Sequence, residues 1–228
     1  MSIVALMAPL KKNDLIKNQS HSILKNLKNA AVLIQNKKAM PFLVCALLMM
    51  ISQLSYSAYM PVYLDDMEFS SPAILMQIAV IAELLSMLFL PLMMIKISIE
   101  SLMLIGTFTY ALRSFLTIYI ENTNFPLMIT VLILNGVSWV IFFISFDMYI
   151  KKISFDYNLH QMQGLKVIFI NGLGVSLSSL ICGHAYNHVM KGDDAHGWQL
   201  FWGLPFIMAA TGFVILICKR KSYVPIVE

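Results

Sequence analysis

Residues 72–97 read PAILMQIAVIAELLSMLFLPLMMIKI, and this stretch decides the fold class. It contains a single acid, Glu83, and no basic residue before Lys96. A helix that crosses a bilayer needs about 20 consecutive apolar residues, and this run is long enough. Because lipid offers no hydrogen-bonding partner to the backbone, a segment of this kind is predicted to be a transmembrane α-helix.

Five more apolar runs of spanning length lie along the chain. Three of the six begin with a proline in the first helical turn, at Pro41, Pro72 and Pro126, where its missing N–H costs nothing. The short connections between runs favour antiparallel neighbours. We therefore expect an all-α membrane protein whose six transmembrane helices lie at about 41–64, 72–97, 102–120, 126–150, 165–189 and 200–218.

The composition excludes several classes of function. Of the 228 residues, 59% are hydrophobic and 12% are charged, whereas a soluble domain has about 25% charged residues. A soluble enzyme, a disordered chain and a nucleic-acid-binding protein are therefore excluded. The three cysteines lie inside apolar runs, which argues against a disulfide framework. No phosphate-binding glycine loop and no nucleophile–base pair is evident, so we expect neither an enzyme nor a cofactor.

The charges outside the runs predict the orientation in the membrane. Residues 1–40 are rich in lysine and are expected to form a basic cytoplasmic arm, either helical at about 23–34 on the membrane surface or a solvated tail. With this arm inside, all but two of the 16 Lys and Arg residues lie on the cytoplasmic side, the exceptions being Lys191 and Arg113. Both termini, including the tail at 221–228, are thus predicted to be cytoplasmic, in the inner cell membrane.

Three charged residues fall within or near the runs, where charge is costly and therefore indicates a site. Glu83 lies near the predicted bilayer midplane, where loss of water favours the neutral carboxyl. It is interpreted as a proton- or substrate-binding group, or as a carboxyl that clamps two helices. Arg113 cannot become neutral, so it either pairs with a buried acid or binds substrate. Asp147 lies four residues before Lys151, which favours an ion pair at a helix end.

Uncharged polar and aromatic side chains form two helical faces. Gln53 and Tyr56 lie on one face of the first run, with Ser52 beside them. In the fourth run, Asn135 and Trp139 share a stripe at i and i+4. An amide and an indole on one stripe suit a ligand with a flat ring and hydroxyl groups, although such a stripe is also typical of helix packing.

The fifth run carries small residues and a histidine pair. Gly172, Gly174 and Gly183 are interpreted as helix-packing positions, the first two also as a flexing point. His184 and His188 are one turn apart, but two ligands without a carboxylate or thiol cluster do not predict a metal site.

Several local patterns together resemble the nucleoside:proton symporter branch of the major facilitator superfamily. Glu83 precedes Pro91 by eight residues, and a Leu-Arg pair follows at 112–113. Further matching positions are Gln163, Gly164, Asn171, Gly172, Gly174, Trp198 and Trp202. The resemblance covers about residues 41–220 and implies the C-terminal six-helix half of such a transporter, with residues 1–40 in the place of its central loop.

The resemblance implies a transport function and a set of site residues. Glu83 would contact the nucleoside or take part in proton coupling. Asn135 and Trp139 match positions where the family places ring-stacking or hydrogen-bonding side chains, and Gln53 is near a family polar pair. The expected partners are a small solute, protons and membrane lipid.

Departures from the family pattern leave alternatives open. Val80 stands where the family has Gln, Tyr56 stands near its Asn, and an Asp-Phe-Phe-Asn stretch reads VIFF at 140–143. A sugar- or aromatic-acid-transporting branch, a non-transporting membrane scaffold in which Glu83 and Arg113 pair, and a truncated remnant are the alternatives. Because transporters of this superfamily place the substrate between two six-helix bundles, a separate N-terminal half or a homodimer partner is also expected.

Overall fold

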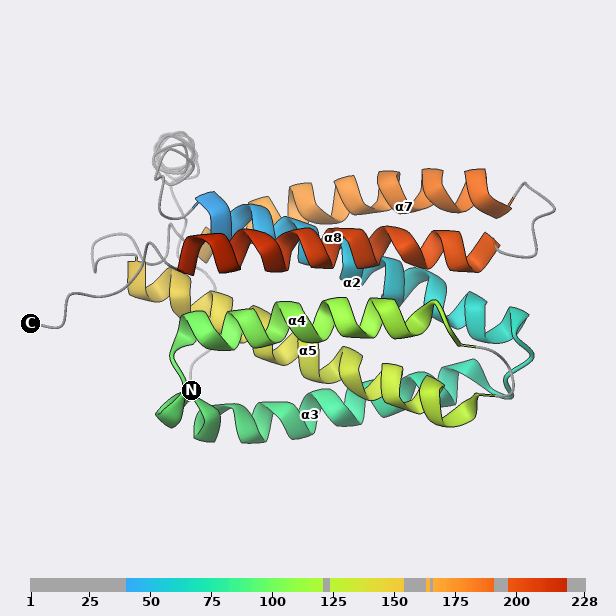
Figure 1. Cartoon of the computed structure of the whole chain (residues 1–228), viewed down its shortest axis with the longest axis horizontal. Coiled ribbons are helices and arrows are strands. Elements are labelled where there is room, and N and C mark those ends of the chain that lie inside the picture. Colours follow the sequence, from blue (N-terminus) through green and yellow to red (C-terminus); the bar gives the residue numbers. More distant parts are fainter. Residues whose placement is uncertain (1–39, 121–123, 154–162, 165, 191–196, 221–228) are drawn as a thin grey trace, which may run out of the picture.

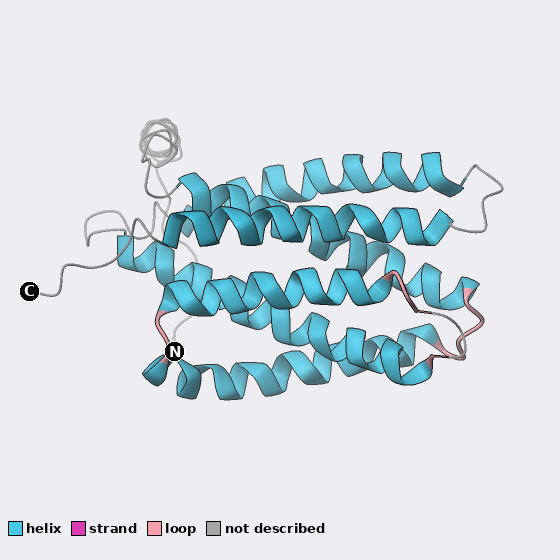
Figure 2. Ribbon diagram, viewed as in Figure 1, coloured by secondary structure: helices cyan, strands magenta, loops and turns pink. Residues whose placement is uncertain are grey.

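The computed structural model describes residues 40–120, 124–153, 163–164, 166–190 and 197–220. Nearly all of these residues are helical, and no strand occurs among them, as Figure 2 shows. The expected all-α fold class is therefore confirmed. The basic arm, apart from Met40, and the tail at 221–228 lie outside the described residues.

The helices follow the predicted runs closely and lie side by side along one axis of the molecule (Figure 1). They are α2 (Met40–Asp66), α3 (Pro72–Lys96), α4 (Ile99–Thr117), α5 (Phe125–Ile153), the π-helix η2 (Ile168–Gly174), α7 (Val175–Met190) and α8 (Gly197–Arg220).

Five of these helical segments are long and apolar enough to cross a membrane: α2, α3, α5, η2 with α7, and α8. The 19-residue α4 is not among them by composition. Its sequence includes Arg113, Thr107 and Ser114, and all three side chains are buried in the bundle. The lower hydropathy of α4 thus reflects polar groups that face protein and not lipid.

The packing order determines which helices can build a site together. α5 packs against both α3 and α4, and α8 packs against α2 and α4. α7 lies beside α2, and α3 is attached mainly through α5 (Figure 1). Consequently α2, α4 and α5 enclose the centre of the bundle, while α3 exposes apolar side chains such as Leu88 and Ile95 along its outer face.

Two glycines lie where the backbone of a neighbouring helix comes close. A Cβ atom at Gly136 of α5 would lie 2.3 Å from the carbonyl oxygen of Ala79 and 2.6 Å from the backbone nitrogen of Glu83, both in α3. A Cβ atom at Gly106 of α4 would lie 2.8 Å from the backbone of Phe142 in α5. Only glycine permits these contacts, so the two crossings fix α3 and α4 against α5.

The fifth predicted run contains a feature that its sequence does not predict. Residues 168–174, IFINGLG, form a π-helix that continues directly into α7. A π-helix inserts an extra residue in the hydrogen-bonding ring and commonly marks a functional position. The Asn-Gly-x-Gly sequence, expected to flex, therefore coincides with a local departure from α-helical geometry.

Candidate functional site

The buried cation Arg113 lies at the centre of the candidate site. It projects from α4 and is 2% exposed. Its Nη2 atom donates to both oxygens of Ser52 in α2, at 2.9 Å to the carbonyl and 2.7 Å to Oγ. A longer contact of 3.4 Å reaches the hydroxyl of Ser114. One guanidinium nitrogen is thus fully occupied by protein acceptors.

The second terminal nitrogen of the guanidinium, Nη1, connects two amide side chains that come from different helices. It donates to Oδ1 of Asn135 in α5 and, at 3.5 Å, to Oε1 of Gln53 in α2. The hydroxyl of Tyr110, one turn before Arg113, donates to the same Gln53 oxygen at 3.0 Å. Arg113 therefore joins three helices through one planar group, as its fork of donors allows.

Two aromatic rings cover the guanidinium. The rings of Tyr56 and Tyr110 each lie with their centroids 5.0 Å from Cζ of Arg113, which is the range of a cation–π interaction. The Tyr56 hydroxyl is buried and has no hydrogen-bond partner among the described residues. We call this set the Arg113 cluster; its members are Ser52, Gln53, Tyr56, Tyr110, Arg113 and Asn135.

Glu83 lies beside the Arg113 cluster and not within it. It is half-buried on the face of α3 that carries the buried Ala79 and Ala82. It is close enough to Tyr110 for an electrostatic interaction. The ion pairs of the described residues do not include a Glu83–Arg113 pair. The buried pair that a scaffold function predicts is therefore not present in this conformation.

The remaining predicted site residues are placed apart from the cluster. Trp139 is half-buried and packs against Phe143 of the same helix, with ring centroids 4.3 Å apart and the ring planes tilted by 44°. It therefore packs against aromatic neighbours, whereas Asn135, one turn earlier, binds Arg113. Sequence reasoning placed Asn135 and Trp139 on one face, but Asn135 contacts the polar Arg113, whereas Trp139 packs against apolar clusters of the core.

The three glycines of the fifth run have different surroundings. A Cβ atom at Gly174 would lie 3.3 Å from Leu47 of α2, and one at Gly183 would lie 3.8 Å from the hydroxyl of Tyr59. Nothing lies within 4 Å of a Cβ atom at Gly172, which is exposed. Gly174 and Gly183 thus lie next to α2, while Gly172 is in open space inside η2.

Ion pairs join helices at the predicted cytoplasmic end. Asp147 of α5 pairs with Lys166, which lies just before η2. This ion pair therefore joins two segments of the chain, whereas the sequence indicated a pair within one helix. Lys152 of α5 pairs with Glu100 of α4 at 2.8 Å. Burial acts to raise the pKa of the Glu100 carboxyl. The hydrogen bond from Lys152 and its positive charge act in the opposite direction and outweigh burial, so the pKa lies below its usual range.

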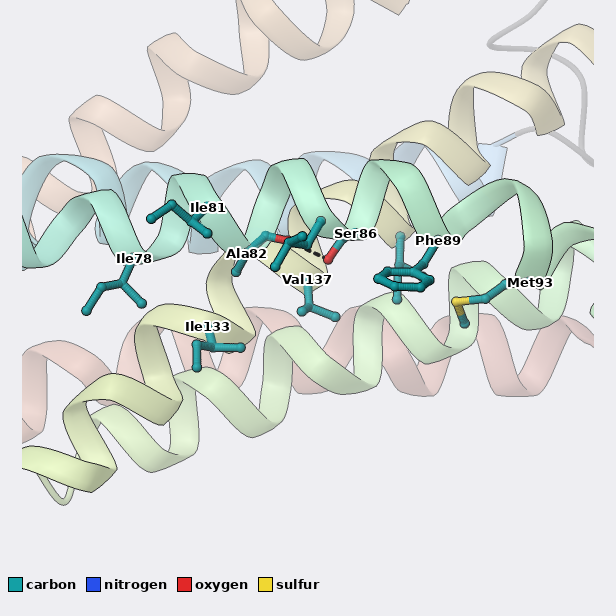
Figure 3. Close-up of a pocket in the computed structure, with 10 residues that line it drawn as sticks. Ile78, Ile81, Ala82, Ser86, Phe89, Met93, Ile133 and Val137 are labelled. Atoms are coloured by element: carbon teal, nitrogen blue, oxygen red, sulfur yellow. Dashed lines mark hydrogen bonds between the residues drawn. The ribbon is translucent and has the colours of Figure 1, made fainter.

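A separate apolar cavity of about 350 Å³ lies between α3 and α5 (Figure 3). Its polar group, the Ser86 hydroxyl, already donates to the Ala82 carbonyl at 2.7 Å. None of the predicted site residues lines it. The lining residues are Ile78, Ile81, Ala82, Leu85, Ser86, Phe89, Met93, Ile133, Val137 and Ile141. Such a surface suits a lipid chain or an apolar helix better than a polar solute.

No group of three or more metal-ligating side chains occurs in the part of the chain that the structure describes. His184 and His188 lie with ring centroids 6.3 Å apart and are both exposed.

Two members of the Arg113 cluster, Ser52 and Tyr110, were not singled out as site residues from the sequence. Tyr110 could have been found from its position three residues before Arg113, which puts both side chains on one helical face.

These features define the class of protein: a multi-pass helical membrane protein that keeps ionisable and hydrogen-bonding groups at the centre of its bundle, as membrane transporters do. Comparison with known sequences then identifies the family. The chain belongs to the nucleoside H⁺ symporter family, whose family model matches residues 2–223. The family resemblance seen in the sequence is thereby confirmed.

Individual relatives are more distant. The chain is 26% identical to the xanthosine permease of Escherichia coli strain K12 over 145 residues, which cover 62% of this chain and 34% of the permease. Crystal structures of the nucleoside transporter NupG and of a NupG mutant match with TM-scores of 0.71 and 0.72, each at 22% identity. These matches confirm the fold as that of half a major-facilitator-type bundle.

The coverage of the matches is uneven. The NupG matches include 85% and 86% of this chain but 50% of the NupG chains. The chain therefore spans about half of the NupG fold and a third of the permease.

Proposed function

We propose that this chain forms half of a secondary active transporter that moves a nucleoside across the inner cell membrane together with protons. The Arg113 cluster is the observation that carries the proposal. It gathers amides, hydroxyls and aromatic rings from α2, α4 and α5 at the middle of a membrane bundle. A nucleoside needs this combination, because its base stacks on rings while its polar edges need hydrogen bonds. Membership of the family supports the same function.

Glu83 is the proposed proton-coupling group. It is an acid within an otherwise apolar spanning helix, half-buried and beside the Arg113 cluster. Acidic side chains within spanning helices are rare and typically mark a substrate or proton pathway. Because Glu83 and Arg113 do not form an ion pair in this structure, the carboxylate is free to exchange protons or to accept from a nucleoside hydroxyl.

Four side chains are the proposed contacts for the solute. Gln53 and Asn135 offer amide nitrogens, and Tyr56 offers a hydroxyl without a partner among the described residues. Trp139, one turn after Asn135 on α5, is proposed to offer a ring for stacking. Arg113 was expected to bind the solute or couple protons. Its terminal nitrogens are occupied by protein acceptors, so we propose that it supports the site instead.

The proposed topology rests on the distribution of Lys and Arg, and the proposed partner rests on the share of its relatives that the chain covers. The distribution of Lys and Arg supports cytoplasmic termini. Because superfamily transporters bind solute between two six-helix bundles, we propose that this bundle works with a second six-helix half or with a second copy of itself. The π-helix at Gly172 and Gly174 is the proposed flexing point, and Gly183 a packing position beside α2.

Uptake of labelled uridine into proteoliposomes tests the proposed function. The full chain should take up uridine when the outside is made acidic, and an uncoupler should abolish uptake. Glu83→Gln should abolish it as well, because the variant holds no exchangeable proton, while Glu68→Gln in an exposed turn should have no effect. Absence of uptake in every oligomeric state would show that this chain does not transport alone.

One variant distinguishes transport from a scaffold role. If the chain only organises other membrane proteins, replacement of both Glu83 and Arg113 by apolar residues leaves its function intact. If it transports, that double variant is inactive.

A further inference from the structure

The way in which Arg113 holds its neighbours has a consequence for the kind of nucleoside recognised, and the inference rests on the proposed function. A guanidinium group can only donate hydrogen bonds. The two side-chain amides in contact with it therefore present their oxygens to it, Oδ1 of Asn135 and Oε1 of Gln53. The Tyr110 hydroxyl donates to the same Gln53 oxygen, which fixes the orientation of this amide a second time.

Once both oxygens face Arg113, both amide nitrogens point elsewhere. Neither nitrogen has an acceptor among the described side chains and backbone. Asn135 belongs to α5 and Gln53 to α2, so the two free donors come from different walls of the bundle. The ring of Tyr56 lies over the same guanidinium, and its hydroxyl is also without a partner among the described residues.

We propose that Arg113 is a positioning residue which locks the amides of Gln53 and Asn135 with their NH₂ groups toward the solute. Because both NH₂ groups are donors, the site then prefers a nucleobase with a carbonyl oxygen at the edge that they contact. A nucleobase with an amino group at that edge binds more weakly. Uridine and inosine carry that oxygen, whereas cytidine and adenosine carry an amino group at the corresponding carbon. Two amino groups facing each other leave both without an acceptor, which disfavours the second class by about tenfold or more.

The orientation of the amides is tested without any ligand. Asn135→Asp turns the oxygen that accepts from Arg113 into part of a charged carboxylate and replaces a nitrogen that has no acceptor among the described residues. The thermal unfolding midpoint of the purified full chain should therefore rise, and Gln53→Glu should raise it too. In an Arg113→Met background, Asn135→Asp should lower the midpoint, because the new carboxylate is buried without a partner. A lower midpoint for Asn135→Asp in the presence of Arg113 would overturn the proposed orientation.

The selectivity is tested by competition binding of uridine against cytidine and of inosine against adenosine. The wild-type chain should prefer uridine and inosine by about tenfold or more. Arg113→Met should lower both ratios toward one because the Asn135 amide can then rotate, while the Tyr110 hydroxyl still holds the amide of Gln53. Arg113→Lys, which keeps a donor but not the fork, should give intermediate ratios. Thr117→Val is the matched control, since this hydroxyl donates to the Arg113 carbonyl at 2.8 Å and touches neither amide.

The outcomes separate this inference from the proposed function. If the wild-type chain binds the nucleosides and Arg113→Met keeps the wild-type ratios, the positioning role is wrong while nucleoside binding stands. If the wild-type chain binds none of the four nucleosides, the proposed function fails together with the selectivity, and the unfolding midpoints still decide the orientation of the amides.

Discussion

Gly136 of α5 is the position where a single methyl group should do the most damage. Replacement by alanine puts a Cβ atom 2.3 Å from the carbonyl oxygen of Ala79 and 2.6 Å from the backbone nitrogen of Glu83. Real Cβ contacts below 3.0 Å are essentially unknown. Because both opposing atoms belong to the backbone, no side chain can rotate away to relieve the contact.

The expected cost follows from this geometry. Restoring van der Waals contact requires α3 to move away from α5 by about 1 Å. In a membrane, helix association depends on close packing and not on the hydrophobic effect, so the separation directly loses stabilising contacts. Overpacking typically costs 1–3 kcal/mol, and an unyielding backbone contact should place Gly136→Ala at about 3 kcal/mol.

The assay is unfolding of the purified chain in mixed micelles by titration with SDS, followed by circular dichroism. Gly203→Ala in α8 is the matched control, because nothing lies within 4 Å of the added methyl group. That variant should be stabilised by about 0.5–1 kcal/mol, since alanine is the better helix former. If Gly136→Ala is as stable as the wild type, or if both variants lose equally, the close approach of α3 and α5 is wrong.

Three further changes test other contacts of the bundle. Arg113→Ala should cost about 2–4 kcal/mol in the same titration, because several buried acceptors lose their donors and a cavity is left; a loss below about 1 kcal/mol would contradict the cluster. Lys152→Ala should flatten the acid side of the curve of stability against pH. In the wild type, the lowered pKa of Glu100 stabilises the folded chain above the unfolded pKa, and this stabilisation disappears as the pH falls through the folded pKa. The variant lacks Lys152 and should therefore lack this dependence. Trp198→Phe should cost about 1 kcal/mol or less by removing the 3.0 Å hydrogen bond to Asp66, an amount read from the unfolding midpoint.

Helix positions could be predicted from the sequence because lipid imposes a length and a polarity on each span. The run predicted at 72–97 is the helix Pro72–Lys96, and the run predicted at 126–150 is the helix Phe125–Ile153. The largest differences fall at helix ends, where polar residues continue the helix beyond the apolar run. Such ends are set by capping and by neighbouring helices, and not by hydropathy.

Four of the six members of the Arg113 cluster were predictable from the sequence, but their arrangement was not. Gln53, Tyr56, Arg113 and Asn135 each stand out as polar groups in apolar runs. Their convergence depends on which helices are neighbours, and helical spacing within one run carries no such information. Asp147 shows the same limit: Lys151 is the nearest cation in the sequence, whereas a partner in the structure is Lys166 from another segment.

The π-helix could not be predicted from sequence patterns. Gly172 and Gly174 indicate reduced helix stability, but one inserted residue leaves no periodic signal in so short a segment. Its place in the bundle, beside Leu47 and Met50 of α2 at Gly174, is a tertiary feature.

The central claim is that nucleoside binding beside the Arg113 cluster is linked to a proton on Glu83. Proton uptake by the purified chain on addition of uridine, measured in weakly buffered detergent solution near neutral pH, tests it most directly. The wild-type chain should take up protons as uridine binds, and Glu83→Gln should take up none. Equal proton uptake by both proteins, or uridine binding by the wild-type chain without any proton uptake, would contradict the claim.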